Sequence, residues 1–136
     1  MNPSLSLGAR PARILIVDDE PDNRELLQIV LNWEGFVTES AASGEEALAS
    51  ASAQPPDLML LDLMMPGLDG CQVTTELKSN AKTEGIPVVI LSAMSDPATR
   101  QRLLSAGAEA FLSKPIDRVE LCQQIRSILR LKAARS

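Results

Sequence analysis

The sequence predicts an α/β fold in which five parallel strands alternate with five helices in a doubly wound sheet. Apolar runs without polar alternation recur along the chain, as expected of strands that helices cover on both faces. Each run leads into turn residues and then into a stretch with the apolar spacing of a helix. The chain has 136 residues, which suits one domain of this kind with little left over.

The composition excludes several classes of function. Net charge is −5, and Trp33, Phe36 and Phe111 are the only aromatic residues, so direct nucleic-acid binding is not expected. No apolar run reaches membrane-spanning length and no signal-peptide core is present, which predicts a cytoplasmic protein without a membrane partner. Cys71 and Cys122 have neither zinc nor disulfide spacing. The absence of histidine excludes a histidine phosphodonor within this segment.

The first strand follows residues 1–12, whose scattered Pro, Gly and Ser predict a flexible lead-in. Residues 13–17 form an apolar run, and Pro21 then suits the first turn of a helix that Gly35 closes. The second strand, 36–40, is shorter and more polar. Its polarity predicts a place at the edge of the sheet.

The third strand is preceded by a short helix. Ser43 and Glu46 fit a capping box that starts this helix, and Pro55 ends it. The strand itself is the unbroken apolar run 58–61, which stops on Asp62. We therefore expect Asp62 at the carboxyl end of a buried central strand, where open α/β sheets place their ligands.

The fourth strand is separated from the third by a helix expected over 71–79, after a loop rich in Pro and Gly. The strand covers 87–91 and begins at Pro87, because a proline is tolerated only as the first residue of such a strand. It ends on Ser92. Asp96 then caps the fourth helix, which stops at Gly107.

The last unit consists of a strand over 108–113 and a helix over 117–132, with 133–136 as a tail or the start of a linker. The predicted domain is therefore 13–132. Five such units make a parallel sheet. The flavodoxin-like strand order 2-1-3-4-5 places the polar second strand at an edge, as its composition requires.

Polar side chains follow four of the predicted strands at the same edge of the sheet. These residues are Asp18, Asp19, Asp62, Ser92 and Lys114. Carboxylates about 4 Å apart repel by about 4 kcal/mol per pair at an effective dielectric near 20, so either their pKa values rise or a divalent cation binds among them. Magnesium suits such oxygen ligands. The lysine and the serine suit phosphoryl oxygens, which predicts a phosphate site with a built-in nucleophile.

Four strings in this order resemble the receiver domain of two-component response regulators, the CheY-like superfamily. The resemblance covers about Ala12 to Leu131, and all four strings fall on predicted strand ends. The strings are Val17-Asp18-Asp19-Glu20, Leu61-Asp62-Leu63-Met64-Met65-Pro66-Gly67-Leu68-Asp69-Gly70, Leu91-Ser92-Ala93 and Lys114-Pro115.

The resemblance implies a phosphoacceptor and a metal site. Asp62 would form an aspartyl phosphate. Asp19 would be the principal Mg²⁺ ligand, with Asp18 helping directly or through water and the backbone carbonyl of Met64 completing the set. Mn²⁺ is a suitable substitute. The domain would accept phosphate with Mg²⁺ but is not expected to be an enzyme with independent turnover.

The remaining family positions concern the phosphoryl group and its readout. Ser92 and Lys114 would each bind a phosphoryl oxygen, and a cis peptide before Pro115 would aim the lysine into the site. Phe111 takes the aromatic switch position. Serine replaces the commoner threonine at position 92, and phenylalanine replaces the commoner tyrosine at position 111.

Two methionines are expected to flank the mouth of the site. Met64 and Met94 each lie two residues beyond a site residue, at positions that tune aspartyl-phosphate hydrolysis in the family. One interpretation is that they exclude water and prolong the phosphorylated state. The other is that they only pad the rim.

The expected partners follow from the resemblance. A sensor histidine kinase or a histidine phosphotransfer protein would donate the phosphoryl group. The surface of the fourth helix, fifth strand and fifth helix would bind an effector or a second copy. Both a stand-alone receiver and a segment of a longer protein, such as a hybrid kinase or cyclase-linked regulator, fit the sequence.

A phosphate-independent pseudo-receiver, acting as an interaction or dimerisation module, is the alternative. Such domains usually lack one of the acids or the lysine, whereas this chain has all three acids and Lys114. A flavodoxin-like cofactor site would need a phosphate loop where Asp18 and Asp19 stand, and no G-x-G-x-x-G motif supports a dinucleotide enzyme. The Asp-x-Asp motif of an aspartate phosphatase is also missing, because Met64 stands two residues after Asp62.

Overall fold

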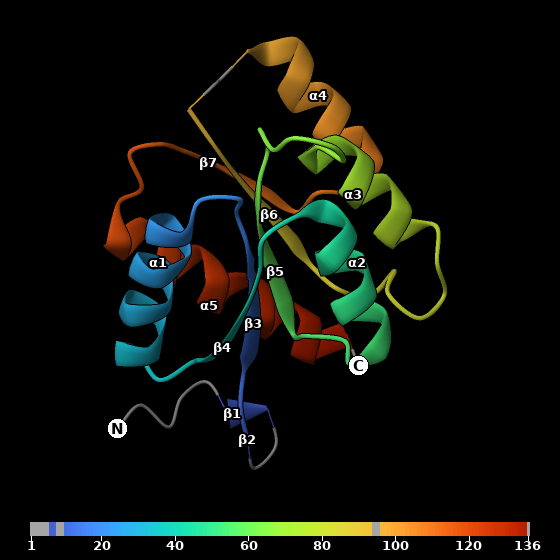
Figure 1. Ribbon diagram of the computed structural model, residues 1–136. Coiled ribbons are helices and arrows are strands. Elements are labelled where there is room, and N and C mark those ends of the chain that lie inside the picture. The colour runs from blue at the N-terminus through green and yellow to red at the C-terminus, as the bar shows by residue number, and fades with distance from the viewer. Residues whose placement is uncertain (1–5, 8–9, 94–95, 136) are drawn as a thin grey trace.

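Five parallel strands form a central sheet with helices on both faces (Figure 1). The computed structural model describes residues 6–7, 10–93 and 96–135. The order β4-β3-β5-β6-β7 is the predicted 2-1-3-4-5 once the short β1 and β2 are set aside, so the predicted fold class and strand order are confirmed. Among the described residues, none of the helices combines the length and apolar character needed to cross a bilayer.

Every predicted helix and strand is present, with ends that differ by a few residues. The strands of the main sheet are β3 (Arg13–Val17), β4 (Val37–Ala41), β5 (Leu58–Asp62), β6 (Val88–Ser92) and β7 (Ala110–Ser113). The helices are α1 (Pro21–Trp33), α2 (Gly44–Ala53), α3 (Gly70–Lys78), α4 (Pro97–Ala106) and α5 (Arg118–Arg135).

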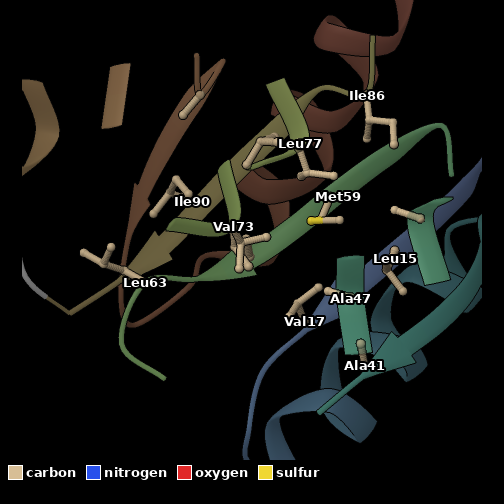
Figure 2. Close-up of a cluster of buried hydrophobic side chains, with 14 of the residues drawn as sticks. Leu15, Val17, Ala41, Ala47, Met59, Leu63, Val73, Leu77, Ile86 and Ile90 are labelled. Carbon is tan, nitrogen blue, oxygen red and sulfur yellow. The ribbon is translucent and has the colours of Figure 1, made fainter. Parts of the chain in front are cut away.

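Alternate residues of the central strands pack into two separate apolar clusters. On one face, Met59 and Leu61 of β5 meet the helices α2, α3 and α4, and Figure 2 shows this cluster with Met59 beside Val73 and Leu77. On the other face, Leu58 and Leu60 meet α1 and α5. Burial of each such side chain stabilises the fold by about 1.5–3 kcal/mol, and it holds β5 rigidly at the centre of the sheet.

The lead-in before the domain contains a short ladder in the part that is described. The sequence predicts only a flexible segment there, whereas β1 (Ser6–Leu7) pairs antiparallel with β2 (Arg10–Pro11). Arg10 donates two hydrogen bonds to the Asp57 carboxylate, at 2.7 and 3.1 Å. The backbone N–H of Arg13 donates a third at 2.7 Å. These bonds tie Arg10 to the start of β5.

The polar contacts at Asp57 control its ionisation. Burial raises the pKa of this carboxyl, but the hydrogen bonds from Arg10 and the Arg13 N–H outweigh it and hold the pKa below its usual range. The Lys132 ammonium donates to the Asp57 carbonyl oxygen at 3.3 Å. Three parts of the chain therefore meet at this aspartate, at the edge of the sheet opposite the predicted site.

Candidate functional site

The predicted site residues stand at one edge of the sheet because the strands are parallel and in register. Asp18 directly follows β3, and Asp62 and Ser92 are the last residues of β5 and β6. Asp62 lies opposite Leu91 on the neighbouring strand, which places Ser92 one residue further along. Lys114 directly follows β7. The carboxyl ends of four strands therefore present these side chains together.

Three acids form a tight cluster at this edge. Asp18, Asp19 and Asp62 each offer a carboxylate oxygen, and these three oxygens lie within 4.8 Å of one another. Asp18 is 2% exposed and Asp62 is 7% exposed, whereas Asp19 faces solvent. Two buried carboxylates this close are unfavourable unless a positive charge or a proton offsets their repulsion.

Asp62 has a basic and a backbone donor beside it. Its Oδ1 lies 3.5 Å from the Lys114 ammonium and accepts a long 3.4 Å hydrogen bond from the Met64 backbone N–H. Burial raises the pKa of Asp62, Lys114 opposes this effect, and the nearby Asp18 adds to it. The negative charge that a nucleophilic carboxylate needs is therefore only partly compensated by the protein.

The donor set fits a small divalent cation. Asp18, Asp19 and Asp62 supply carboxylate oxygens, which are the ligands that Mg²⁺ prefers, and the exposed Asp19 leaves room for the waters that this ion retains. A cation here would favour the ionised form of Asp62 and so oppose the rise in its pKa that burial and the nearby Asp18 cause. The residues present therefore fit the metal that the resemblance implies.

Ser92 and Lys114 are joined through the backbone. The Lys114 N–H donates to the Ser92 carbonyl oxygen at 2.8 Å, which aligns the ends of β6 and β7. Ser92 is 1% exposed, and the peptide bond between Lys114 and Pro115 is cis. The Ser92 hydroxyl thus belongs to β6, the strand beside β5, and the Lys114 ammonium reaches Asp62 from the end of β7, one strand further along.

Phe111 lies on β7, away from the acid cluster. Its ring packs partly buried against the apolar cluster that contains residues of α3 and α4. The guanidinium of Arg100, on α4, lies 4.9 Å from the ring centroid, within the range of a cation–π contact. Phe111 therefore connects the sheet to the α4 surface and does not contact the acids in the arrangement described.

The rim differs for the two methionines. The Met64 side chain is 61% exposed, so it stands at the mouth beside Asp62 without being held in the core. Met94 lies outside the described residues. Beside the mouth, a pocket of about 300 Å³ is lined by residues of α1, of the ends of β3 and β6, and of the segment after β7: Asp18, Asn23, Leu26, Leu27, Leu91, Lys114, Pro115 and Ile116.

Sequence reasoning missed the part that α1 plays in the site. Arg24, one turn into α1, donates from Nη1 to the Asp18 carbonyl oxygen at 2.7 Å. Leu26, on the same helix, lines the pocket and is 61% exposed. An arginine so close to a helix N-terminus is an available signal, because a positive charge is disfavoured there without nearby acids.

Comparisons with known proteins agree with this geometry. A family model described as the response regulator receiver domain matches residues 14–126. Response regulator PleD of Caulobacter vibrioides is 45% identical over 121 residues, which is 89% of this chain and 27% of PleD. The DNA-binding response regulator MtrA of Mycolicibacterium smegmatis is 41% identical over 118 residues, covering 87% of this chain and 50% of MtrA. The chain therefore spans at most half the length of these two relatives.

A solved structure is also similar over nearly the whole domain. The signal receiver domain of a signal transduction histidine kinase from Syntrophus aciditrophicus superposes with a TM-score of 0.81 at 36% identity. The match covers 88% of this chain and 90% of that one.

Proposed function

The chain belongs to the response regulator receiver domain family, and from this membership we propose that it is a phosphoacceptor switch in a two-component phosphorelay. Asp62 receives a phosphoryl group with Mg²⁺ bound, and the modified domain then changes a partner-binding surface. The observation that carries the proposal is the buried Asp62 carboxylate, with two further acids within 4.8 Å and Lys114 at 3.5 Å.

The proposed chemistry is transfer between a nitrogen and an oxygen. One carboxylate oxygen of Asp62 attacks phosphorus, and an O–P bond forms as the P–N bond of a phosphohistidine breaks. The imidazole leaves with the electron pair of that bond and takes up a proton from solvent. Attack and departure must lie in line, so a rigid strand end is a suitable place for the nucleophile.

The surrounding residues share the charge of the incoming group. Lys114 and Ser92 bind phosphoryl oxygens, and Asp18, Asp19, Asp62 and the Met64 carbonyl hold the Mg²⁺ or a substituting Mn²⁺. The metal, when bound, neutralises negative charge on the phosphoryl oxygens. The domain modifies itself once per donor and is not expected to turn over a substrate independently.

The donor histidine lies outside this segment, because its 136 residues include no histidine. A sensor histidine kinase or a histidine phosphotransfer protein would present its phosphohistidine at the mouth, in the cytoplasm. Leu26, Pro115 and Ile116 line the pocket beside that mouth and offer an apolar surface on which such a donor could pack. We expect this surface, more than the acids, to determine which donor protein binds.

The output is proposed to leave through α4, β7 and α5. Binding of Ser92 to a phosphoryl oxygen would draw the end of β6 inward and shift Phe111, whose ring contacts Arg100 on α4. An effector or a second copy would sense that surface. PleD and MtrA extend well beyond the matched segment, so attached output segments, or action as a stand-alone receiver, are both consistent with the matches.

The first test uses a small phosphodonor. Incubation with acetyl phosphate and Mg²⁺ should raise the intact mass by one phosphoryl group, and EDTA should prevent the increase. A phosphate-independent interaction module would show no increase under either condition, which would refute the proposed function.

A further inference from the structure

We propose that Arg24 is a positioning residue that holds the acidic loop between β3 and α1 in the geometry that binds the metal. The inference rests on the proposed function, because it assigns Arg24 a role toward the Mg²⁺ ligands Asp18 and Asp19. Arg24 itself belongs to neither the ligand set nor the phosphate-binding set.

The contact that supports this role is short and directed at the loop backbone. Arg24 lies half-buried in α1, and its Nη1 donates to the Asp18 carbonyl oxygen at 2.7 Å. Figure 1 shows the chain leaving β3 and turning directly into α1. The hydrogen bond from Arg24 to Asp18 spans that turn. A hydrogen bond from a charged donor is roughly twice as strong as a neutral one, and here the acceptor is a backbone carbonyl oxygen.

Asp18 is thereby held at three points. Its N–H donates to the Ala41 carbonyl at 3.2 Å, and its Oδ1 accepts from the Glu20 N–H at 2.9 Å. The bond from Arg24 to its carbonyl is the third. Asp19 lies between Asp18 and Glu20, so both of its neighbours are anchored while its own side chain remains exposed.

The position of the arginine in the helix supports a specific role. A positive side chain near a helix N-terminus opposes the helix dipole. The N-cap residue of α1, Glu20, makes no side-chain cap hydrogen bond, so α1 is not started by a capping side chain. The hydrogen bond to the Asp18 carbonyl oxygen therefore offsets the unfavourable position of Arg24 near the helix N-terminus.

Two effects of removing Arg24 have opposite signs, which makes the test decisive. Loss of a positive charge near the site would by itself tighten Mg²⁺ binding. Loss of the anchor on Asp18 would weaken it, and outer-shell partners of metal ligands commonly contribute about 10- to 100-fold to affinity. We expect the second effect to dominate in Arg24→Ala, with Arg24→Lys between it and the wild type because lysine keeps the charge and can donate but lacks the planar guanidinium.

The experiment is a calorimetric Mg²⁺ titration of wild type, Arg24→Ala and Arg24→Lys. The matched control is Arg130→Ala, which removes the same side chain from an exposed position on α5. Kd should rise about 10-fold or more in Arg24→Ala and stay unchanged in the control. Phosphorylation by acetyl phosphate should need more Mg²⁺ for half-saturation, while the rate at saturating Mg²⁺ stays near that of wild type.

The outcomes separate this inference from the proposed function. If wild type binds Mg²⁺ and Arg24→Ala binds it equally or more tightly, the positioning role alone is overturned. Wild type that does not bind Mg²⁺ overturns the proposed function and this inference with it. Should Arg24→Ala fail to fold in EDTA, Arg24→Met replaces it, because methionine keeps the apolar stem and removes the donor, and an unchanged Kd in that folded variant also overturns the role.

Discussion

The ammonium of Lys114 lies 3.5 Å from Oδ1 of Asp62. A charge-assisted bond between such groups is usually 2.7–2.9 Å, so the lysine is near the carboxylate without being closed onto it. Its side chain is 30% exposed, whereas that of Asp62 is 9% exposed. The lysine therefore reaches the site from its open side, where the oxygens of an incoming phosphoryl group would lie.

Removal of this lysine should separate metal binding from phosphate binding. We expect Lys114→Ala to bind Mg²⁺ as well as wild type or slightly better, because a like charge leaves the neighbourhood of the cation. Phosphorylation of Asp62, or its effect on structure, should fall, because a phosphoryl oxygen loses its cationic partner. Mg²⁺ binding is best measured by calorimetry. Tryptophan fluorescence is less suitable, because Trp33 is 81% exposed at the end of α1 far from the acids. A large loss of Mg²⁺ affinity would contradict the assigned role.

Neutralising the phosphoacceptor should stabilise the metal-free domain. Because the pKa of Asp62 is raised in the folded protein, its contribution to stability is present at low pH and is lost as pH rises through the folded-state pKa. At pH 7 in EDTA, Asp62→Asn should therefore melt higher, by about 2–6 °C. The gain should shrink toward pH 4 and in saturating Mg²⁺. A lower melting temperature of the variant at pH 7 would show that the ionised Asp62 carboxylate does not destabilise the metal-free domain.

Asp57 should show the opposite pH dependence. Its lowered pKa stabilises the fold above the unfolded-state pKa near 3.9, and this stabilisation is lost as pH falls through the folded-state value. Asp57→Asn should cost about 1–3 kcal/mol at pH 7, and Arg10→Ala less, because Arg10 is largely exposed. Urea unfolding at pH 7 and pH 3 measures both. An equal cost at the two pH values would mean that ionisation is not involved.

The lifetime of the phosphorylated state tests the methionine at the rim. Met64 is exposed beside Asp62 and offers no group that could orient a hydrolytic water. We expect Met64→Asn to lose phosphate faster than wild type, with Met94→Glu tested alongside it on sequence grounds. The decay of phosphoprotein after donor removal measures this effect. Unchanged decay in both variants would leave the methionines as padding only.

The strand ends were predictable from the sequence, whereas the contacts that brace them were not. An apolar run that stops on Asp62 identifies both the strand and the site residue, since the side chains change from apolar to acidic at that position. The bond from Arg10 to Asp57 joins residues 47 apart, and nothing in local periodicity pairs them. The place of Arg24 near a helix N-terminus indicates a nearby partner, but only the fold identifies that partner as the Asp18 carbonyl oxygen.

The register of the sheet explains this difference. The local sequence marks where each of these strands ends, and parallel pairing then brings their carboxyl ends to one edge of the sheet. No knowledge of side-chain packing is needed for that step. Long side chains that cross between elements depend on rotamers and on the exact packing of α1. The lead-in likewise has too little apolar character to predict that β1 and β2 pair.

The measurement that tests the central proposal most directly is chemical mapping of the phosphorylated residue. Protein treated with acetyl phosphate and Mg²⁺ would be reduced with borohydride, which converts an aspartyl phosphate to homoserine, then digested and sequenced by mass spectrometry. We expect homoserine at position 62, none at positions 18 or 19, and none anywhere in Asp62→Asn. Homoserine at another aspartate, or equal labelling of the variant, would contradict the assignment of Asp62 as the phosphoacceptor.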